Sequence, residues 1–241
     1  MKRNLILSII FALVLFTSCK ENSLQPPEKY PFILDLIDIS DYADGGWFLV
    51  EEINMGDTVN RPWVEVQVKL HYKNWKGVVA ITLDSFEIND YNVRLNISPY
   101  TSHTWNVTAN PKYNVPSIEK TIPGIEPIEI TSHNMNDTIS MTGTIKWVPA
   151  SDTSHTYVVL FVSKHEVFTK DTTFTGYVLF TKTADNGTFT FKPSDFLGIG
   201  IKSGDSVDIE FIRIWRMLEK IDGKNYLFAT STSKVISLKL H

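Results

Sequence analysis

The chain has 241 residues, a formal net charge of −4 at neutral pH and a single cysteine. One cysteine cannot form an intramolecular disulfide, so stability must come from a buried core, and an apolar content of 43% is enough for one large or two ordinary cores. A weakly acidic chain without a basic patch argues against a nucleic-acid partner.

The N-terminus has the pattern of a secretory leader. Met1–Arg3 is basic, and Leu5–Phe16 is apolar but too short to span a bilayer as a helix. The small residues Thr17 and Ser18 precede Cys19, and a polar segment follows at once. This arrangement resembles the signal of bacterial lipoproteins, in which the cysteine is acylated and becomes the first residue of the mature chain.

The resemblance implies a signal peptide over 1–18 and a lipidated tether over 19–30, which contains a Pro-Pro pair and is expected to be extended. It also implies a membrane partner reached through lipid, such as palmitate, on Cys19. The charged residues after Cys19 are similar to the export signal of surface lipoproteins of the Bacteroidota. Attachment to the outer membrane is therefore expected, with the periplasmic or cell-surface side left open.

Beyond the tether, period-two alternation replaces helical periodicity. In Val64–Tyr72, apolar and polar residues alternate strictly, as in a strand with one face on a core. Turn-forming dipeptides such as Asn186-Gly187 and Asp222-Gly223 separate the runs. The predicted strands lie at 46–53, 64–72, 77–83, 92–98, 103–108, 126–131, 138–147, 156–163, 173–182, 187–192, 206–217 and 225–240. The run Phe211–Met217 breaks the alternation, which is typical of a central strand covered on both faces or of a bulged strand.

These short strands predict an all-β protein made of antiparallel sandwiches. The proline-rich segment 109–125 shows no alternation and suggests a boundary between domains at 31–115 and 125–241. Within the second, Phe189–Leu197 reads as a strand entering a single helical turn, and Gly204–Phe211 as the next strand. This order resembles the late strands of fibronectin type III domains and implies two immunoglobulin-like β-sandwich domains. One continuous sandwich of two large sheets is the alternative.

Sequence signatures of catalysis are mostly missing. The chain has no Gly-x-Ser-x-Gly elbow, no His-Glu-x-x-His pair and no phosphate-binding loop. The six histidines are scattered singly, whereas zinc ligands usually include a closely spaced pair. We therefore predict no enzyme, no cofactor and no metal, and an envelope hydrolase stays as a minor alternative.

Aromatic residues crowd the first half of the chain. Trp75 lies in an expected hairpin turn, and Tyr100 and Trp105 flank a polar segment. Aromatic rings on exposed loops can stack on sugars or anchor a protein partner. Trp75, Tyr100 and Trp105 are thus candidate glycan or partner contacts, while the alternative is that these rings fill the core.

Four short segments are similar to the O-glycosylation sequon of Bacteroidota envelope proteins, an aspartate followed by Ser or Thr and then a small or aliphatic residue. The resemblance implies modification at Thr58, Thr138, Thr172 and Ser206. The alternative is ordinary turn chemistry, in which an aspartate ends a turn and the next residues open a strand.

Taken together, these features predict a membrane-anchored envelope lipoprotein whose sandwich domains have a non-catalytic binding or assembly role. Its expected partner is a polysaccharide or an envelope protein. The alternatives are a cell-surface glycan-binding module that uses exposed aromatic rings and an envelope enzyme.

Overall fold

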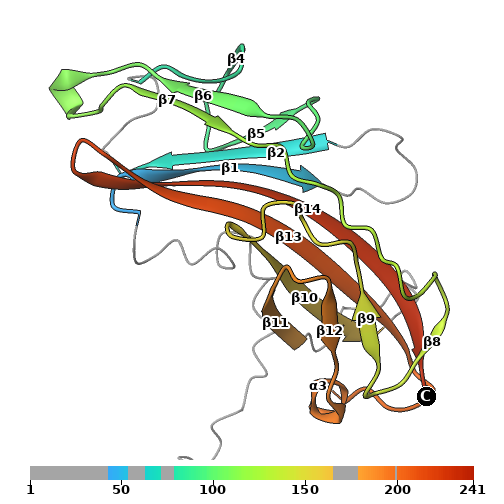
Figure 1. The fold of residues 1–241 in the computed structure, drawn as a ribbon. Coiled ribbons are helices and arrows are strands. Elements are labelled where there is room, and N and C mark those ends of the chain that lie inside the picture. The colour runs from blue at the N-terminus through green and yellow to red at the C-terminus, as the bar shows by residue number, and fades with distance from the viewer. Residues whose placement is uncertain (1–42, 54–62, 72–78, 165–178, 199) are drawn as a thin grey trace, which may run out of the picture. The chain divides into compact units, whose positions relative to one another are not determined.

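A computed structural model describes residues 43–53, 63–71, 79–164, 179–198 and 200–241, all within the unit Phe32–His241. These residues form fourteen strands, one short α-helix and one 3-10 turn (Figure 1). The strands are β1 (Gly46–Ile53), β2 (Trp63–Leu70), β3 (Ile81–Leu83), β4 (Phe86–Glu87), β5 (Asn92–Leu95), β6 (His103–Val107), β7 (Ile118–Ile122), β8 (Thr138–Ile139), β9 (Thr144–Lys146), β10 (Thr156–Lys164), β11 (Leu179–Ala184), β12 (Thr188–Thr190), β13 (Ser206–Ile221) and β14 (Lys224–Leu240). The helix α3 is Pro193–Leu197 and the 3-10 turn η2 is Pro111–Tyr113. The predicted all-β class with mainly antiparallel sheets is confirmed.

Three sheets organise the described residues. The largest has eight strands in the order β11-β10-β13-β14-β1-β2-β5, with β8 also paired to β14. A four-stranded sheet has the order β4-β3-β6-β7, and β12 pairs with β9. Most pairs are antiparallel, as predicted, but β1 and β8 each run parallel to β14. Parallel pairing needs a long connection, and here almost the whole body lies between β1 and β14.

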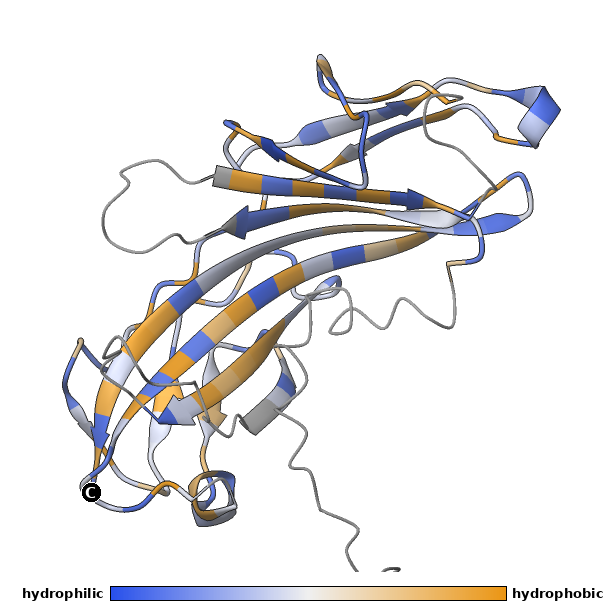
Figure 2. Cartoon of the chain, turned by 180° about the vertical axis from the view of Figure 1, so that it is seen from behind, coloured by the Kyte–Doolittle hydropathy of each residue, from blue (hydrophilic) through white to orange (hydrophobic). Residues whose placement is uncertain are grey.

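The long strands β13 and β14 carry two separate cores on one face of the large sheet. Hydrophobic and hydrophilic bands alternate along this hairpin (Figure 2). On β13, Phe211 belongs to a core with β10, α3 and β12, whereas Trp215 belongs to a core with β1, β2 and the four-stranded sheet. Every second residue of a strand points to the same face, so Phe211 and Trp215, four residues apart, place both cores on the same side of β13.

Between the two cores, the same face turns polar. Arg213 lies between Phe211 and Trp215 on β13, and Thr230 and Thr232 occupy the corresponding stretch of β14. All three side chains are buried. The band therefore places a positive charge in the interior, where it needs a partner.

A third core covers the opposite face of the large sheet. It contains Leu49 of β1, Val159 of β10, Ile214 of β13 and Ala229 of β14. The sequence-based prediction that the run around Ile214 forms a central strand is therefore confirmed, since β13 lies between β10 and β14 and is covered on both faces.

Three local predictions were wrong. The proline-rich segment expected to lack strands contains β7, because its prolines lie outside Ile118–Ile122 and leave every backbone donor of that stretch available for pairing. In the strand predicted at 126–131, the described pairing is a single bridge from Ile130 to Trp147. The strand predicted at 138–147 is split into β8 and β9 by a turn closed by a hydrogen bond from the Gly143 amide to the Ser140 carbonyl.

Strands of both predicted domains belong to the large sheet. β1, β2 and β5 come from 31–115, and β10, β11, β13 and β14 come from 125–241. Two independent sandwiches would not share a sheet in this way, although the two cores do divide near the expected boundary. The domain boundaries themselves stay a prediction. No helix among the described residues is long and apolar enough to cross a bilayer.

Candidate functional site

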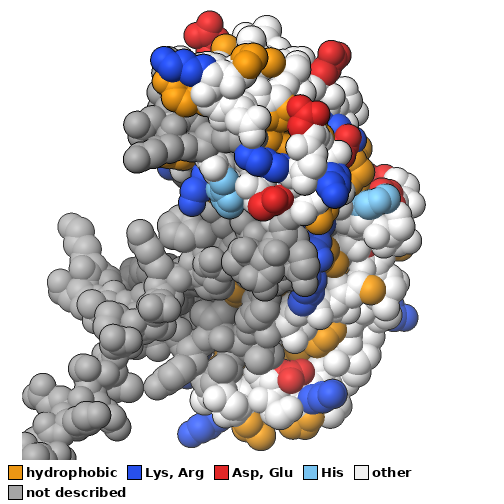
Figure 3. All heavy atoms as spheres, turned by 90° about the vertical axis from the view of Figure 1, so that its left-hand side faces the viewer, with side chains coloured by type: hydrophobic (Ala, Val, Ile, Leu, Met, Phe, Trp, Pro, Cys, Tyr) orange, Lys and Arg blue, Asp and Glu red, His pale blue; other side chains and the backbone are white. Residues whose placement is uncertain are grey.

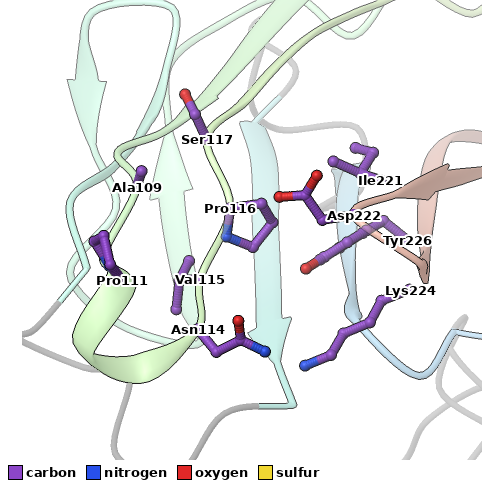
Figure 4. Close-up of a pocket in the computed structure, with 10 residues that line it drawn as sticks. All are labelled: Ala109, Pro111, Asn114, Val115, Pro116, Ser117, Ile221, Asp222, Lys224 and Tyr226. Carbon is purple, nitrogen blue, oxygen red and sulfur yellow. The ribbon is translucent and has the colours of Figure 1, made fainter.

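A cavity of about 270 Å³ lies between the loop that follows β6 and the turn of the β13–β14 hairpin (Figure 4). One wall is formed by the loop residues Asn114, Val115, Pro116 and Ser117. The other is formed by residues of the β13–β14 hairpin, with the side chain of Tyr226 between those of Asp222 and Lys224 (Figure 4).

Backbone geometry holds both walls in place. Asn110 and Val115 exchange two backbone hydrogen bonds, of 2.9 and 3.1 Å, which close the loop around η2. Asn114 has the left-handed conformation, with φ of 55°. In the hairpin, Asp222 and Gly223 both have positive φ, 48° and 82°, as a two-residue turn of the I′ type requires. Each wall is thus a closed turn with little freedom to rearrange.

Tyr226 is fixed from below by a glycine. A Cβ atom at Gly45 would lie 2.6 Å from the Tyr226 ring, so only glycine allows the backbone to approach this closely. The Tyr226 ring also lies 6.4 Å from the ring of Phe48 in the first core. The closed end of the cavity is therefore an extension of that core.

The cavity lining combines opposite charges with neutral polar groups. The side chains of Lys224 and Asn114 point toward one another from the two walls, and the carboxylate of Asp222 points toward Pro116 (Figure 4). Asn114, Ser117 and Asp222 are exposed at the mouth, whereas Val115 and Pro116 are buried between them. The site can therefore donate and accept hydrogen bonds beside an apolar surface.

A second polar cluster lies where the loop before β6 meets β1. The Tyr100 hydroxyl donates to Oε1 of Glu52 at 2.6 Å, and the Thr232 hydroxyl donates to Oε2 of the same carboxylate. Burial, together with the hydrogen bond to Glu52, raises the pKa of Tyr100 to about 12. The Tyr100 ring is 42% exposed, so it presents an aromatic surface held from one end.

The polar band between the cores is organised by Arg213. Its Nε atom lies 2.8 Å from Oδ2 of Asp185, and both side chains are almost completely buried. The guanidinium also donates to the carbonyl oxygens of Glu126, at 2.9 Å, and Val148. Asp185 accepts a further hydrogen bond of 2.7 Å from the indole of Trp147. This network joins β13 to the turn that follows β11 and to two further loops, and we interpret it as structural.

An acidic cluster lies on the opposite face of the large sheet. The pKa of Glu51 is raised to about 7, mainly by burial and to a smaller extent by the nearby negative charges of Glu65 and Glu210. Burial likewise raises the pKa of Glu210. Gln67 donates to Glu65 at 3.1 Å and more weakly to Glu51 at 3.4 Å. No group of His, Cys, Asp or Glu side chains among the described residues could hold a metal ion.

One Asp-Ser-His grouping superficially resembles a catalytic arrangement. Ser154 donates to Asp152 at 2.6 Å, and His155 Nδ1 lies 2.9 Å from both the Asp152 carboxylate and the Ser154 hydroxyl. A nucleophilic relay needs the serine and the acid on different ring nitrogens of the histidine. Here they share one nitrogen, and the hydrogen bond from Ser154 is the main reason that the pKa of Asp152 falls to about 2. The grouping is a turn stabilised by its own side chains.

The structure separates the predicted aromatic contacts. Trp105 is fully buried in the first core, with its ring centroid 5.0 Å from that of Phe48, so the prediction that it contacts a glycan or partner was wrong. The reason is strand parity, because Trp105 shares the inward face of β6 with His103 and Val107. Tyr100 is exposed, and Trp75 lies outside the described residues.

Two of the candidate modification residues are described. Thr138 and Ser206 are exposed and pair with Lys239 from its two sides, in β8 and β13. The two residues therefore lie on either side of β14 at one end of the large sheet. Thr58 and Thr172, like Cys19, lie outside the described residues. Modification of these sites stays a prediction.

The charges on the surface follow no single sign. On the face that Figure 3 shows, acidic and basic side chains of the described residues are interspersed. On this face the described residues form no continuous basic stripe.

Comparisons with known proteins add little beyond the fold. No protein-family model matches the chain, and no curated protein sequence matches it. Among solved structures, the crystal structure of the chicken CNTN1 FN1-FN3 domains is similar over 83% of this chain and 68% of that chain. The identity is 12% and the TM-score is 0.24. The assignment of the fold therefore stands on the strands and sheets themselves.

Replacing Tyr100 with phenylalanine tests the second polar cluster. The substitution removes a hydrogen bond to a carboxylate at a partly exposed site, so we expect the free energy of unfolding to fall by about 0.5–1.5 kcal/mol. Urea denaturation measures the change. Tyr113→Phe, which keeps the ring beside Lys112, serves as the control and should change stability less. Equal effects of the two substitutions would contradict a stabilising role for the Tyr100–Glu52 bond.

Proposed function

We propose that this chain is an envelope lipoprotein, held at the outer membrane by acyl chains on Cys19, whose β-sandwich body binds or assembles with a partner and does not catalyse a reaction. One observation carries the anchor: the only cysteine of the chain directly follows an apolar leader and two small residues. Each buried methylene of an acyl chain contributes ~0.8 kcal/mol to membrane binding, so several chains on one cysteine hold a protein firmly.

The binding role is supported by how the polar groups of the body are used. The buried ion pair of Arg213 and Asp185 is enclosed between the cores, and the Asp152 cluster stabilises its own turn. The polar groups around Asp222 line a cavity that offers both hydrogen-bond donors and acceptors. These features fit recognition better than acid–base chemistry.

Replacing Cys19 with serine is the direct test of the anchor. When the chain is expressed in a Gram-negative host that is fed an alkynyl fatty acid, the wild type should carry the label and fractionate with membranes. The Cys19→Ser variant should lose the label completely and move to the soluble envelope fraction, because a serine hydroxyl cannot form the thioether through which the lipid is attached.

Ser18→Ala is the matched control, because alanine keeps the small residue before the cysteine and should leave labelling intact. A wild-type protein that keeps its leader and carries no label would refute the anchor. So would a Cys19→Ser variant that stays labelled to the wild-type level.

A glycan-binding module that uses exposed aromatic rings is the second candidate. Tyr100 favours it, since its ring is exposed and held by Glu52 in a fixed position. The burial of Trp105 removes one of the three rings on which this candidate was based. The partner of the body is thus a polysaccharide or an envelope protein.

A further inference from the structure

The size of the cavity beside the β13–β14 hairpin limits what it can hold. Its volume of about 270 Å³ equals that of roughly nine water molecules in the liquid. Pockets for drug-sized ligands begin at about 300 Å³. The cavity therefore has room for one small ring or a compact end group.

The lining of the cavity carries both a positive and a negative charge, so it does not favour a ligand that is purely anionic or purely cationic. Asp222 and Lys224 belong to the same hairpin turn and carry opposite charges. An anion attracted by Lys224 would be repelled by the carboxylate of Asp222. A cation attracted by Asp222 would be repelled by the ammonium group of Lys224. A neutral hydroxyl suits both groups, because it donates to a carboxylate and accepts from an ammonium.

The wall formed by the loop after β6 provides further groups that could contact a hydroxylated ligand. Asn114 offers an amide that donates and accepts, and Ser117 offers a hydroxyl that does the same. Val115 and Pro116 provide buried apolar surface between these two residues. A ring with hydroxyls along its edge and C–H bonds on its face matches such a wall. Because closed turns hold both walls, little ordering is needed when a ligand enters.

We propose that this cavity binds a neutral polyhydroxylated ring, a single sugar unit such as the end residue of a glycan. The proposal rests on the proposed binding role of the body and assigns it a site that includes none of the predicted aromatic contacts. Asp222 and Lys224 contact the hydroxyls from one side, and Asn114 and Ser117 contact them from the other.

Saturation-transfer-difference NMR tests the proposal on the full chain as purified from the expression host in micelles of a detergent without a sugar headgroup. The probes are glucose, galactose, mannose and N-acetylglucosamine, with empty micelles as the blank. We expect at least one sugar to bind with a dissociation constant in the millimolar range, as befits a small ligand at an open site.

Two variants locate the binding. Asp222→Asn replaces the carboxylate but preserves the turn, since Asn-Gly is a preferred I′ pair. Lys224→Met removes the ammonium and keeps most of the side-chain stem. Each should weaken binding by about 10-fold or more, because a hydrogen bond to a charged group contributes about 1.5–3 kcal/mol. Lys220→Met, on the same hairpin but outside the lining, should leave the affinity unchanged. An unchanged melting temperature shows that each variant is folded.

The proposal is overturned if no sugar saturates, or if Lys220→Met weakens binding as much as Lys224→Met. It is also overturned if glycine or inorganic phosphate displaces the sugar at a lower concentration, because the site would then prefer a charged ligand. Labelling of Cys19 is measured on the same samples. A labelled chain that binds no sugar would refute sugar binding in the cavity but support the lipid anchor. An unlabelled chain that binds sugar would refute the lipid anchor but support sugar binding in the cavity.

Discussion

Replacing Arg213 with methionine is expected to lower the free energy of unfolding by about 3–5 kcal/mol, the usual cost of breaking a buried ion pair from one side. Methionine leaves the Asp185 carboxylate buried without its cation. It also leaves the carbonyl oxygens of Glu126 and Val148 without the donor that they share. Urea denaturation followed by circular dichroism measures the loss.

Arg94→Met is the matched control for this experiment. Arg94 is mostly exposed, and its Nε atom lies 3.8 Å from the Glu65 carboxylate, so its loss should change stability by less than about 1 kcal/mol. The double variant Arg213→Met, Asp185→Leu removes both buried charges and should be less destabilised than the sum of the single variants. Strict additivity would contradict a direct coupling of Arg213 and Asp185.

Replacing Glu51 with glutamine is expected to stabilise the protein at pH 8 by up to about 3 kcal/mol, because a tenfold change in proton affinity corresponds to about 1.4 kcal/mol. The pKa of Glu51 is raised from 4.5 to about 7 in the folded protein. A raised carboxyl pKa means that the folded state holds the proton more tightly than the unfolded state. The contribution of Glu51 to stability is therefore most favourable below pH 4.5 and declines as the pH rises to about 7.

The pH dependence separates this effect from a change in packing. Glutamine does not ionise, so the gain over the wild type should be large at pH 8 and nearly absent at pH 4. Glu52→Gln is the neighbouring control on the other face of β1, where the carboxylate accepts hydrogen bonds from Tyr100 and Thr232. It should destabilise the protein, because amides accept such bonds less strongly. A Glu51→Gln variant with equal gains at pH 4 and pH 8 would refute the electrostatic explanation.

Elements with strong local patterns could be predicted from the sequence. β2 and β14 follow runs of alternating residues, and the Asp222-Gly223 pair marks the turn before β14. Their structure is determined mainly by residues close together in the chain. β7 was missed because nearby prolines and a glycine hid its short alternation.

Trp105 shows that a strand can be predicted correctly while one of its side chains is wrongly predicted to be exposed. The strand at 103–108 was predicted, and its parity places Trp105 on the same side as Val107. That alternation was the signal that could have identified Trp105 as a core residue. The polar residues beside it favoured the opposite interpretation.

Neither the cavity nor the buried ion pair could be predicted from local sequence patterns. The loop of Asn114 and the hairpin of Asp222 are far apart in the sequence, and only the fold brings them together. Arg213 has the same strand parity as the buried Phe211, but no local pattern identifies Asp185 as its partner. Such contacts depend on which strands are neighbours, and period-two alternation carries no information about that choice.

The parallel pairing of β1 with β14 has a consequence for how the protein reaches its native state. β1 cannot pair with β14 during synthesis until the last strand of the large sheet has emerged, because its register runs from Gly46 opposite Tyr226 to Glu51 opposite Ser231. β14 also contributes to all three cores, through Phe228, Ile236 and Leu227. Closing so distant a contact is slow. The central sheet can therefore assemble only after most of the body has been synthesised, and until then β1 lacks one of its two neighbouring strands.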